Sequence, residues 1–476
     1  MTYINDNVII LSFIKERIAM KKLGSFLLTA ALVIAMFACS KASAPAGSSG
    51  AATPAAAPAA APATAAPKQT TVSLWAIVPT QSHMNVLMPA WQKAHPEIKI
   101  DYLTFGDSPQ YYQKLQVAMQ GDSGPDLFTV QTRSSVEQYS DFAVPVDSIA
   151  QQTMGDNWQK NFIDIALASA KSNKLGKYIG LPLNVEGEMM VIFNKNMMQE
   201  AGLTKFEPDD YAEFKSMCDK IKAKGTIPLV IGGGSDYICS DLFMYYAPQW
   251  QPGIIQDAEN GKVKWTDPNM VNAMNACVKL FKEIFQPGAT GLQQYPDARD
   301  QYFYARKAAM FATGSWHVGF VAPGGEKYGT AMEKDDTGYF MMPQLGPKPA
   351  KFIVDPGQIL TMNKAAQDAQ ATQTFWTWLT MGDGSVIFTN LMQGGPSRTD
   401  IKVDQLDAIP SQFERDQITA IFSHMADNYG PERPQSDVVL SAIAAAVQNC
   451  VNGAKPAAEL AKIQPISDKA LKDRQQ

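Results

Sequence analysis

The chain has 476 residues, more than one hydrophobic core usually serves, so we expect two lobes. Its composition, with 46% hydrophobic and 18% charged residues, is that of a soluble globular protein, and its formal net charge of −5 is small. This charge and the lack of an extended basic cluster exclude nucleic acid as the expected partner.

Residues 20–39 have the pattern of an export signal. Two lysines after Met20 precede an apolar run, residues 23–38, that ends at Cys39. At 1.5 Å per residue this run covers roughly 24 Å, which is shorter than the roughly 30 Å hydrocarbon core of a membrane. We therefore predict a cleaved signal peptide over residues 1–39, with Met20 as the true start, rather than a permanent membrane helix.

The end of this signal resembles a bacterial lipobox, Met36-Phe37-Ala38-Cys39, although Met36 stands where leucine is usual. The resemblance implies that Cys39 carries a diacylglyceryl group and anchors the exported protein to a membrane of the cell envelope. An ordinary export signal with an incidental cysteine is the alternative. Residues 40–68 are almost entirely Ala, Pro, Ser, Gly and Thr, so we expect a disordered linker reaching at most about 90 Å.

After Lys68, predicted strands alternate with predicted helices. The apolar run 72–78 predicts a buried strand, and the apolar spacing over 86–94 predicts a helix that ends near residues 95–96. Residues 99–103 read as a second strand, 112–119 as a helix and 127–130 as a third strand. This alternation predicts a mainly parallel sheet whose ligand crevice lies beyond the carboxyl ends of its strands.

The middle and the end of the chain repeat this style. Stripes of apolar residues predict helices over 211–221, 270–284 and 439–451, and residues 228–231 predict a buried strand. We interpret their methionines and aromatic residues as core. Cys218, Cys239, Cys277 and Cys450 are compatible with two disulfides or with buried thiols, and their place on apolar stripes favours thiols.

Several short motifs, in this order, resemble the family 1 extracellular solute-binding proteins, the group that contains maltose-binding protein. The resemblance implies a periplasmic-binding-protein type II-like α/β fold, with two α/β lobes of mixed, mainly parallel sheets joined by a hinge and the ligand in the cleft between them. It implies that lobe 1 contains residues 69–183 and about 317–395, and lobe 2 about 184–316 and 396–476. The motifs are Val72–Trp75, Gly124–Leu127, Gly180–Pro182, Phe193–Lys195, Gly314–Trp316, Asp355–Gly357 and Gly395–Ser397.

A sugar presents ring hydroxyls and weakly apolar C–H faces. A sugar receptor therefore needs flat aromatic side chains, together with planar amides, carboxylates or guanidinium groups. The resemblance favours Glu186, because the family's inter-lobe strand carries a ligand-binding glutamate. For each aromatic residue core packing is the alternative. The predicted ligand-binding residues are Trp75, Tyr111, Trp250 and Trp316 among the aromatics, and Gln81, Gln131, Glu186, Asp355 and Arg398 among the polar residues.

We therefore expect a solute-binding lipoprotein of an ABC importer that delivers a sugar to the permease membrane subunits. We expect a monomer with no cofactor and no metal, and not an enzyme, because the sequence has no HExxH, Gly-x-Ser-x-Gly or Walker A motif. The alternatives are a receptor for a quaternary amine, a glycosidase that uses Glu186 and Glu188, and a surface protein that docks a host or cell-wall polymer.

Overall fold

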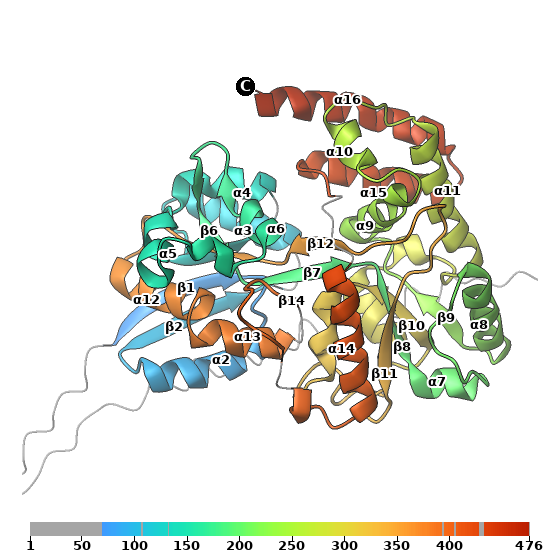
Figure 1. Ribbon diagram of the computed structural model, residues 1–476, viewed down its shortest axis with the longest axis horizontal. Helices are drawn as coiled ribbons and strands as arrows, with labels where there is room; N and C mark the ends of the chain where they lie inside the picture. The colour runs from blue at the N-terminus through green and yellow to red at the C-terminus, as the bar shows by residue number, and fades with distance from the viewer. Residues whose placement is uncertain are drawn as a thin grey trace, which may run out of the picture. The chain divides into compact units, whose positions relative to one another are not determined.

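Two mixed sheets, each covered by helices, organise the folded chain (Figure 1). The computed structural model describes residues 69–105, 108–131, 133–392, 395–403, 406–427 and 433–475. These residues belong to one compact unit, Pro67–Gln476. The predicted signal peptide, Cys39 and the linker therefore lie outside the described residues.

The first sheet has five strands in the order β2-β1-β3-β13-β6. Strand β1 runs parallel to β2 and β3, whereas β13 runs antiparallel to β3 and β6. The three strands and two helices predicted after Lys68 are confirmed, each within a few residues of its predicted bounds. The elements are β1 (Thr70–Ala76), α2 (Gln81–Ala94), β2 (Ile98–Thr104), α3 (Ser108–Gln120), β3 (Leu127–Val130), β6 (Gly180–Pro182) and β13 (Ile359–Met362).

A buried carboxylate explains one of the motifs in this sheet. Asp126, just before β3, accepts hydrogen bonds from the backbone N–H of Ser73 at 2.8 Å and from its hydroxyl at 2.6 Å. Its other oxygen accepts from the backbone N–H of Gln367 at 2.9 Å. A buried charge needs such partners, so Asp126 joins three chain segments that are far apart in sequence.

The second sheet has four strands in the order β11-β8-β10-β9. Strand β8 is antiparallel to both β10 and β11, and β9 is parallel to β10. The division predicted from the resemblance placed the chain after about residue 317 in lobe 1. The pairing of β11 with β8 instead keeps residues 337–341 in the second sheet. The strands are β8 (Met190–Asn194), β9 (Ile227–Val230), β10 (Ala308–Thr313) and β11 (Thr337–Met341).

A third, three-stranded sheet joins these two sheets. Its central strand β7 (Asn184–Glu188) follows β6 and precedes β8, and Figure 1 shows it crossing between the two halves of the fold. Strands β12 (Ile353–Pro356) and β14 (Gly395–Pro396) pair antiparallel with β7 on either side. Met189, between β7 and β8, has a left-handed φ of 66°, which redirects the chain into the second sheet. The chain thus returns to the first sheet through β12 and β13.

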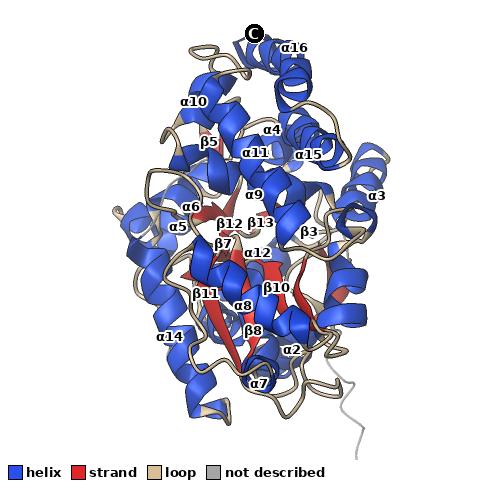
Figure 2. Cartoon of the chain, turned by 90° about the vertical axis from the view of Figure 1, so that its right-hand side faces the viewer, coloured by secondary structure: helices blue, strands red, loops and turns tan. Residues whose placement is uncertain are grey.

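Helices cover both sheets (Figure 2). No described helix combines the length and the apolar character that a bilayer span requires. The predicted helices over 211–221, 270–284 and 439–451 and the predicted strand over 228–231 are confirmed. The first lobe contains α4 (Arg133–Tyr139), α5 (Asp147–Met154), α6 (Asp164–Ser169), α12 (Ala369–Thr380) and α13 (Asp383–Met392), and the second contains α7 (Lys195–Glu200), α8 (Tyr211–Ala223), α9 (Asp236–Tyr246), α10 (Ile254–Glu259), α11 (Pro268–Glu283), α14 (Gln412–Asp427), α15 (Asp437–Val451) and α16 (Pro456–Gln475).

Side chains of α14 occupy the outer edge of β11. Glu414 accepts hydrogen bonds from the backbone N–H and the hydroxyl of Thr337, at 3.0 and 2.8 Å, and Gln417 accepts from the backbone N–H of Tyr339 at 3.0 Å. The ammonium of Lys327 lies 2.6 Å from the same Glu414 oxygen, and both side chains are buried. The edge strand is therefore hydrogen-bonded on both sides.

The four cysteines of the described chain, Cys218, Cys239, Cys277 and Cys450, are free and buried. Burial raises the pKa of all four thiols, to about 12 for Cys239 and about 11 for Cys450. The interpretation as buried thiols is confirmed, and because the thiolate is the nucleophilic form, these cysteines are poorly reactive.

Candidate functional site

The polar side chains of the crossing strand β7 lie at the centre of the candidate site. Asn184, Glu186 and Glu188 alternate along the strand and share one face of it. Glu186 is only 8% exposed, and its carboxylate accepts a hydrogen bond from the Asn184 amide at 2.9 Å. In the antiparallel register Glu186 lies opposite Asp355 of β12. The backbone of Asp355 is therefore next to Glu186, and its side chain lies outside the described part of the structure.

Trp316 packs against the cores of both lobes. It lies in the short helix η7 (Ser315–Val321), and its indole N–H donates a hydrogen bond to the hydroxyl of Tyr295 at 2.8 Å. The preceding Ser315 hydroxyl accepts from the backbone N–H of Gly187 at 2.8 Å, which ties this segment to β7. A Cβ at Gly314 would stand 1.9 Å from the indole, so only glycine allows this approach. Trp316 is thus held at the junction of the two lobes.

A second aromatic ring lies beside Trp316 and was missed by the sequence reasoning. Tyr237, in the first turn of α9, has its ring centroid 6.3 Å from that of Trp316, edge to face. Tyr237 is 38% exposed, whereas residues 238–246 of the same helix are buried. An accessible tyrosine next to a half-buried tryptophan offers two faces to a ligand.

A buried ionic cluster adjoins β7. Arg433 donates hydrogen bonds through Nη2 to Glu188 and, at 2.8 Å, to Asp241 of α9. Glu188 and Asp241 are 3% and 0% exposed. Burial raises the pKa of Glu188, and Arg433 opposes this shift by favouring the charged form. Because Arg433 is 245 residues from Glu188 and 192 from Asp241, no local sequence pattern could have indicated the cluster.

Three of the predicted residues lie at the carboxyl edge of the first sheet. Trp75 near the end of β1 is half-buried, with the Lys114 ammonium 5.3 Å from its ring centroid. Gln81 begins α2, is exposed, and donates a hydrogen bond to the Tyr102 hydroxyl at 2.7 Å. Gln131 directly follows β3, the strand beside β1. These positions agree with the predicted crevice beyond the ends of the strands.

Two predicted ligand-binding residues have structural roles instead. Tyr111 is fully buried, and its hydroxyl both donates to and accepts from the backbone of Thr129, at 2.6 and 2.9 Å. Arg398 is 8% exposed and binds the backbone of Met381 at 2.5 Å and both carboxylate oxygens of Asp400 at 2.9 and 2.6 Å. Their polar groups are therefore already used, and both assignments are corrected. Residues 397–399, which were predicted in lobe 2, instead form backbone hydrogen bonds with Asn161 and Ile163 of lobe 1.

Trp250, the remaining predicted aromatic residue, packs in the second lobe. It follows the short helix η4 (Ala247–Gln249), is half-buried, and packs against the core of the second lobe. Its place in that core supports the packing alternative.

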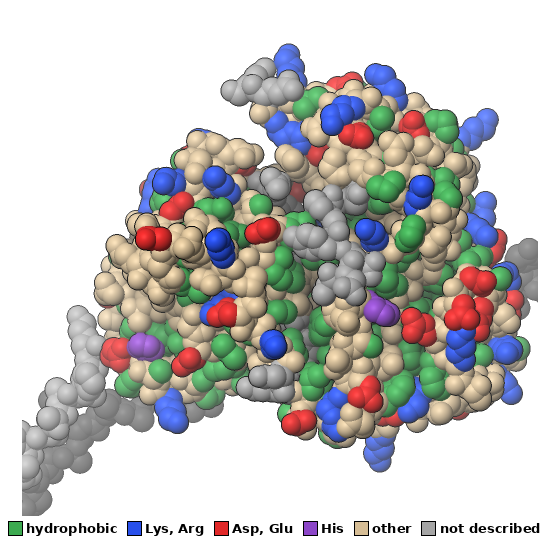
Figure 3. Space-filling model, in the orientation of Figure 1, with side chains coloured by type: hydrophobic (Ala, Val, Ile, Leu, Met, Phe, Trp, Pro, Cys, Tyr) green, Lys and Arg blue, Asp and Glu red, His purple; other side chains and the backbone are tan. Residues whose placement is uncertain are grey.

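Among the described residues no group of three or more His, Cys, Asp or Glu side chains is arranged to hold a metal ion. On the face drawn in Figure 3, positive and negative side chains are interspersed, so this face carries no large field of one sign.

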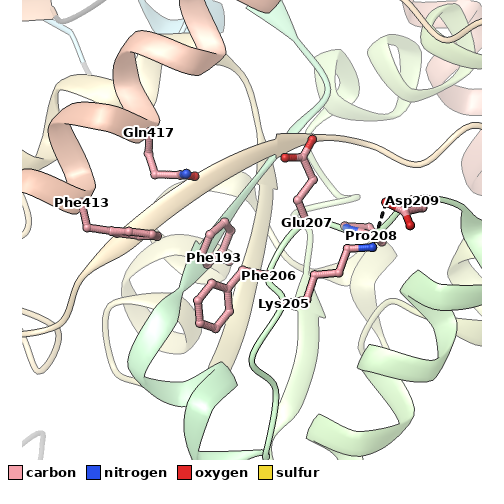
Figure 4. A pocket seen from close by; sticks show the side chains of 8 residues that line it. All are labelled: Phe193, Lys205, Phe206, Glu207, Pro208, Asp209, Phe413 and Gln417. Atoms are coloured by element: carbon pink, nitrogen blue, oxygen red, sulfur yellow. Dashed lines mark ion pairs between the residues drawn. The ribbon is translucent and has the colours of Figure 1, made fainter.

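A separate hollow lies on the second lobe (Figure 4). It has a volume of about 560 Å³ and is lined by the loop before α8 and by α14. Three phenylalanines, Phe193, Phe206 and Phe413, face it. None of the predicted ligand-binding residues lines it, so this hollow is separate from the site around β7.

More than half of the chain matches a known protein family. Residues 49–381 match the model of the family described as bacterial extracellular solute-binding protein. A curated protein of Mesorhizobium japonicum, described as a probable sugar-binding periplasmic protein, is 40% identical over 58 residues. This match covers 12% of the chain and spans 13% of the length of that relative.

Solved structures share the fold across nearly their whole length. A chitin oligosaccharide binding protein superimposes with a TM-score of 0.68 at 19% identity, covering 85% of this chain and 99% of that one. Maltose-bound MalE3 of T. maritima gives 0.69 at 16% identity, covering 84% and 100%. The maltodextrin-binding domain of Bdellovibrio bacteriovorus, bound to maltotriose, gives 0.64 at 16% identity, covering 85% and 100%. The predicted periplasmic-binding-protein fold is thereby confirmed.

Proposed function

Because the chain belongs to the family of bacterial extracellular solute-binding proteins, we propose that it captures a sugar or an oligosaccharide between its two lobes and delivers it to the membrane subunits of an ABC importer. Membership of this family confirms the prediction that the chain is a binding protein and not an enzyme. The identity of the solute, the residues that bind it and the delivery step form our proposal.

The position of Trp316 carries the proposal. It contacts both cores, and the accessible ring of Tyr237 stands beside it. These two aromatic faces, and the carboxylate of Glu186 on the strand that Ser315 contacts, supply the two contacts that a sugar needs, a flat apolar wall and a charged hydrogen-bond acceptor. Trp75, Gln81 and Gln131 supply the opposing side from the first sheet, and we retain Asp355 through its register with Glu186.

The solved structures of the same fold support a carbohydrate. Three of them are described as binding chitin oligosaccharide, maltose and maltotriose. Another, from Agrobacterium radiobacter, is described in complex with ribitol. A bound solute would draw the lobes together about β7, β12 and β14, since three short strands are the connection between the two larger sheets.

A melting-temperature screen of the purified protein tests the proposal. The panel contains maltotriose, triacetylchitotriose, xylotriose, ribitol and choline at millimolar concentration. A solute that binds only the folded state raises the melting temperature by mass action, and at 100 times Kd it adds about 2.7 kcal/mol. We expect at least one carbohydrate to stabilise the protein. Stabilisation by choline alone would contradict the sugar and indicate a quaternary amine as the solute.

We also propose that the protein is a lipoprotein. This rests on the sequence at Met36–Cys39 and on the Ala/Pro-rich residues 40–68, all of which precede the described residues. A lipid on Cys39 followed by an extended linker would let the binding lobes move at the surface of the envelope membrane while staying near the permease.

A further inference from the structure

Residues 433–437, which we call the clasp, contact the crossing strand β7 and both lobes. At its first residue, Arg433 binds Glu188 of β7 and Asp241 of α9 through the same guanidinium nitrogen. This contact links the clasp to the strand that joins the lobes. The guanidinium side chain is only 14% exposed, so water screens the contact weakly.

The middle of the clasp is fixed to the second lobe by Glu259. The carboxylate of Glu259, which is 2% exposed, accepts from the backbone N–H of Gln435 at 2.9 and 3.0 Å and from that of Ser436 at 3.1 Å. Arg474 of α16 lies 2.7 Å from the same carboxylate. Charge-assisted hydrogen bonds of this kind are about twice as strong as neutral ones. The middle of the clasp is therefore attached to the second lobe.

The last residue of the clasp reaches the first lobe. The Ser134 hydroxyl, on α4, donates a hydrogen bond to the carboxylate of Asp437, which is 303 residues away at the start of α15. Asp437 also lies near Tyr112 of the first lobe, whose pKa is raised mainly by burial and additionally by the charge of Asp437. Helix α4 packs within the first lobe through Val136 and Tyr139. The contact between Ser134 and Asp437 thus joins the lobes directly.

We propose that the clasp holds the two lobes closed and thereby sets how long a captured solute is retained. Arg433 binds Glu188 on β7, and Gln435 binds Glu259 in the second lobe. Asp437 binds Ser134 in the first lobe, so opening the lobes has to break this last hydrogen bond. The retention of solute rests on the proposed function, whereas the clasp itself can be tested on the protein without any solute.

Disulfide trapping tests whether Ser134 and Asp437 lie close together. In the purified protein carrying Ser134→Cys and Asp437→Cys, mild oxidation should crosslink the two positions at least ten times faster than in the control pair Ser134→Cys and Ser216→Cys. Ser216 is an exposed residue of α8 in the second lobe, so its pair with Ser134 is the matched control. The native thiols compete weakly, because their pKa values are raised by burial.

Scattering of the solute-free protein tests the energetic role. Ser134→Ala removes one charge-assisted hydrogen bond, and we expect the ratio of closed to open molecules to fall about tenfold, with a larger radius of gyration. Ser216→Ala should leave the radius unchanged.

These outcomes separate the clasp from the proposed function. Slow crosslinking, or an unchanged radius in Ser134→Ala, overturns the clasp even when a sugar binds. Fast crosslinking and a larger radius support the clasp even when maltotriose and the other carbohydrates do not bind, in which case the proposed function fails alone. Where maltotriose binds, its dissociation rate should rise about tenfold in Ser134→Ala, and an unchanged rate overturns the role in retention.

Discussion

Replacing Trp316 by alanine tests whether the junction of the two lobes is the binding site. The half-buried indole contacts both cores. Its removal therefore loses part of the 150–250 Å² of burial that an aromatic side chain contributes. About 100–150 Å² at about 25 cal/mol per Å² corresponds to about 2.5–4 kcal/mol. Loss of the hydrogen bond to Tyr295 adds about 1 kcal/mol. Both are costs to folding, and their sum is an upper bound because the unfolded chain already buries part of this area.

We expect Trp316→Ala to lower the free energy of unfolding by about 2–3 kcal/mol and to weaken solute binding by about 1–3 kcal/mol. Urea denaturation measures the first quantity, and calorimetric titration with the solute found in the melting-temperature screen measures the second. Trp316→Phe keeps an aromatic face and loses the indole N–H, so it should recover most of the affinity.

Trp265 provides the matched control. It is a fully buried tryptophan of the second lobe, and Trp265→Ala should cost about 3–5 kcal/mol of stability without changing the affinity of the folded fraction. Unchanged affinity in Trp316→Ala would remove Trp316 from the site. Unchanged stability would instead contradict its packing against both cores.

Three further predictions concern other parts of the chain. Cys39→Ala should release the protein from membranes without changing solute affinity, and equal retention in a fractionation assay would contradict the lipid anchor. Glu414→Gln should cost about 3–5 kcal/mol in urea denaturation, because it leaves the buried Lys327 ammonium without its charge partner, whereas a loss below 1 kcal/mol would show that the site relaxes. Burial lowers the pKa of His83 from 6.5 to about 4, so the folded state disfavours protonation and stability should fall as the pH drops from about 6.5 to about 4. His83→Gln should flatten this dependence, and identical pH profiles of the two proteins would contradict it.

The sequence predicted those elements whose pattern is local. Residues 439–451 form a helix because their apolar residues recur at helical spacing and bury one face, as Val439, Ile443 and Val447 do. The crossing strand is different, because only the resemblance, and no local apolar pattern, indicated an inter-lobe strand at residues 184–188. It is a fully buried strand only because β12 and β14, from much later in the chain, pair with it. No local pattern contains that information.

In the candidate site too, local motifs could be predicted from the sequence and long-range contacts could not. Trp316 was predicted from its motif and does lie at the junction of the lobes, but the chain stays in the second sheet until β11 because of the pairing with β8. Tyr111 was misassigned because neighbouring tyrosines on a helix point in different directions, and only the fold decides which enters the core. Arg433 and Tyr237 were missed because long-range packing, and not spacing, brings them to β7 and Trp316.

The side chains that α14 places along β11 have a consequence for aggregation. An open strand edge is a template on which other chains can add a strand, and here Glu414 and Gln417 occupy the edge N–H groups of Thr337 and Tyr339. Detachment of α14 alone would uncover that edge while the rest of the sheet remained paired. Self-association on heating is therefore expected to begin from a molecule that is otherwise native, at a temperature set by the local stability of α14 rather than by that of the whole fold.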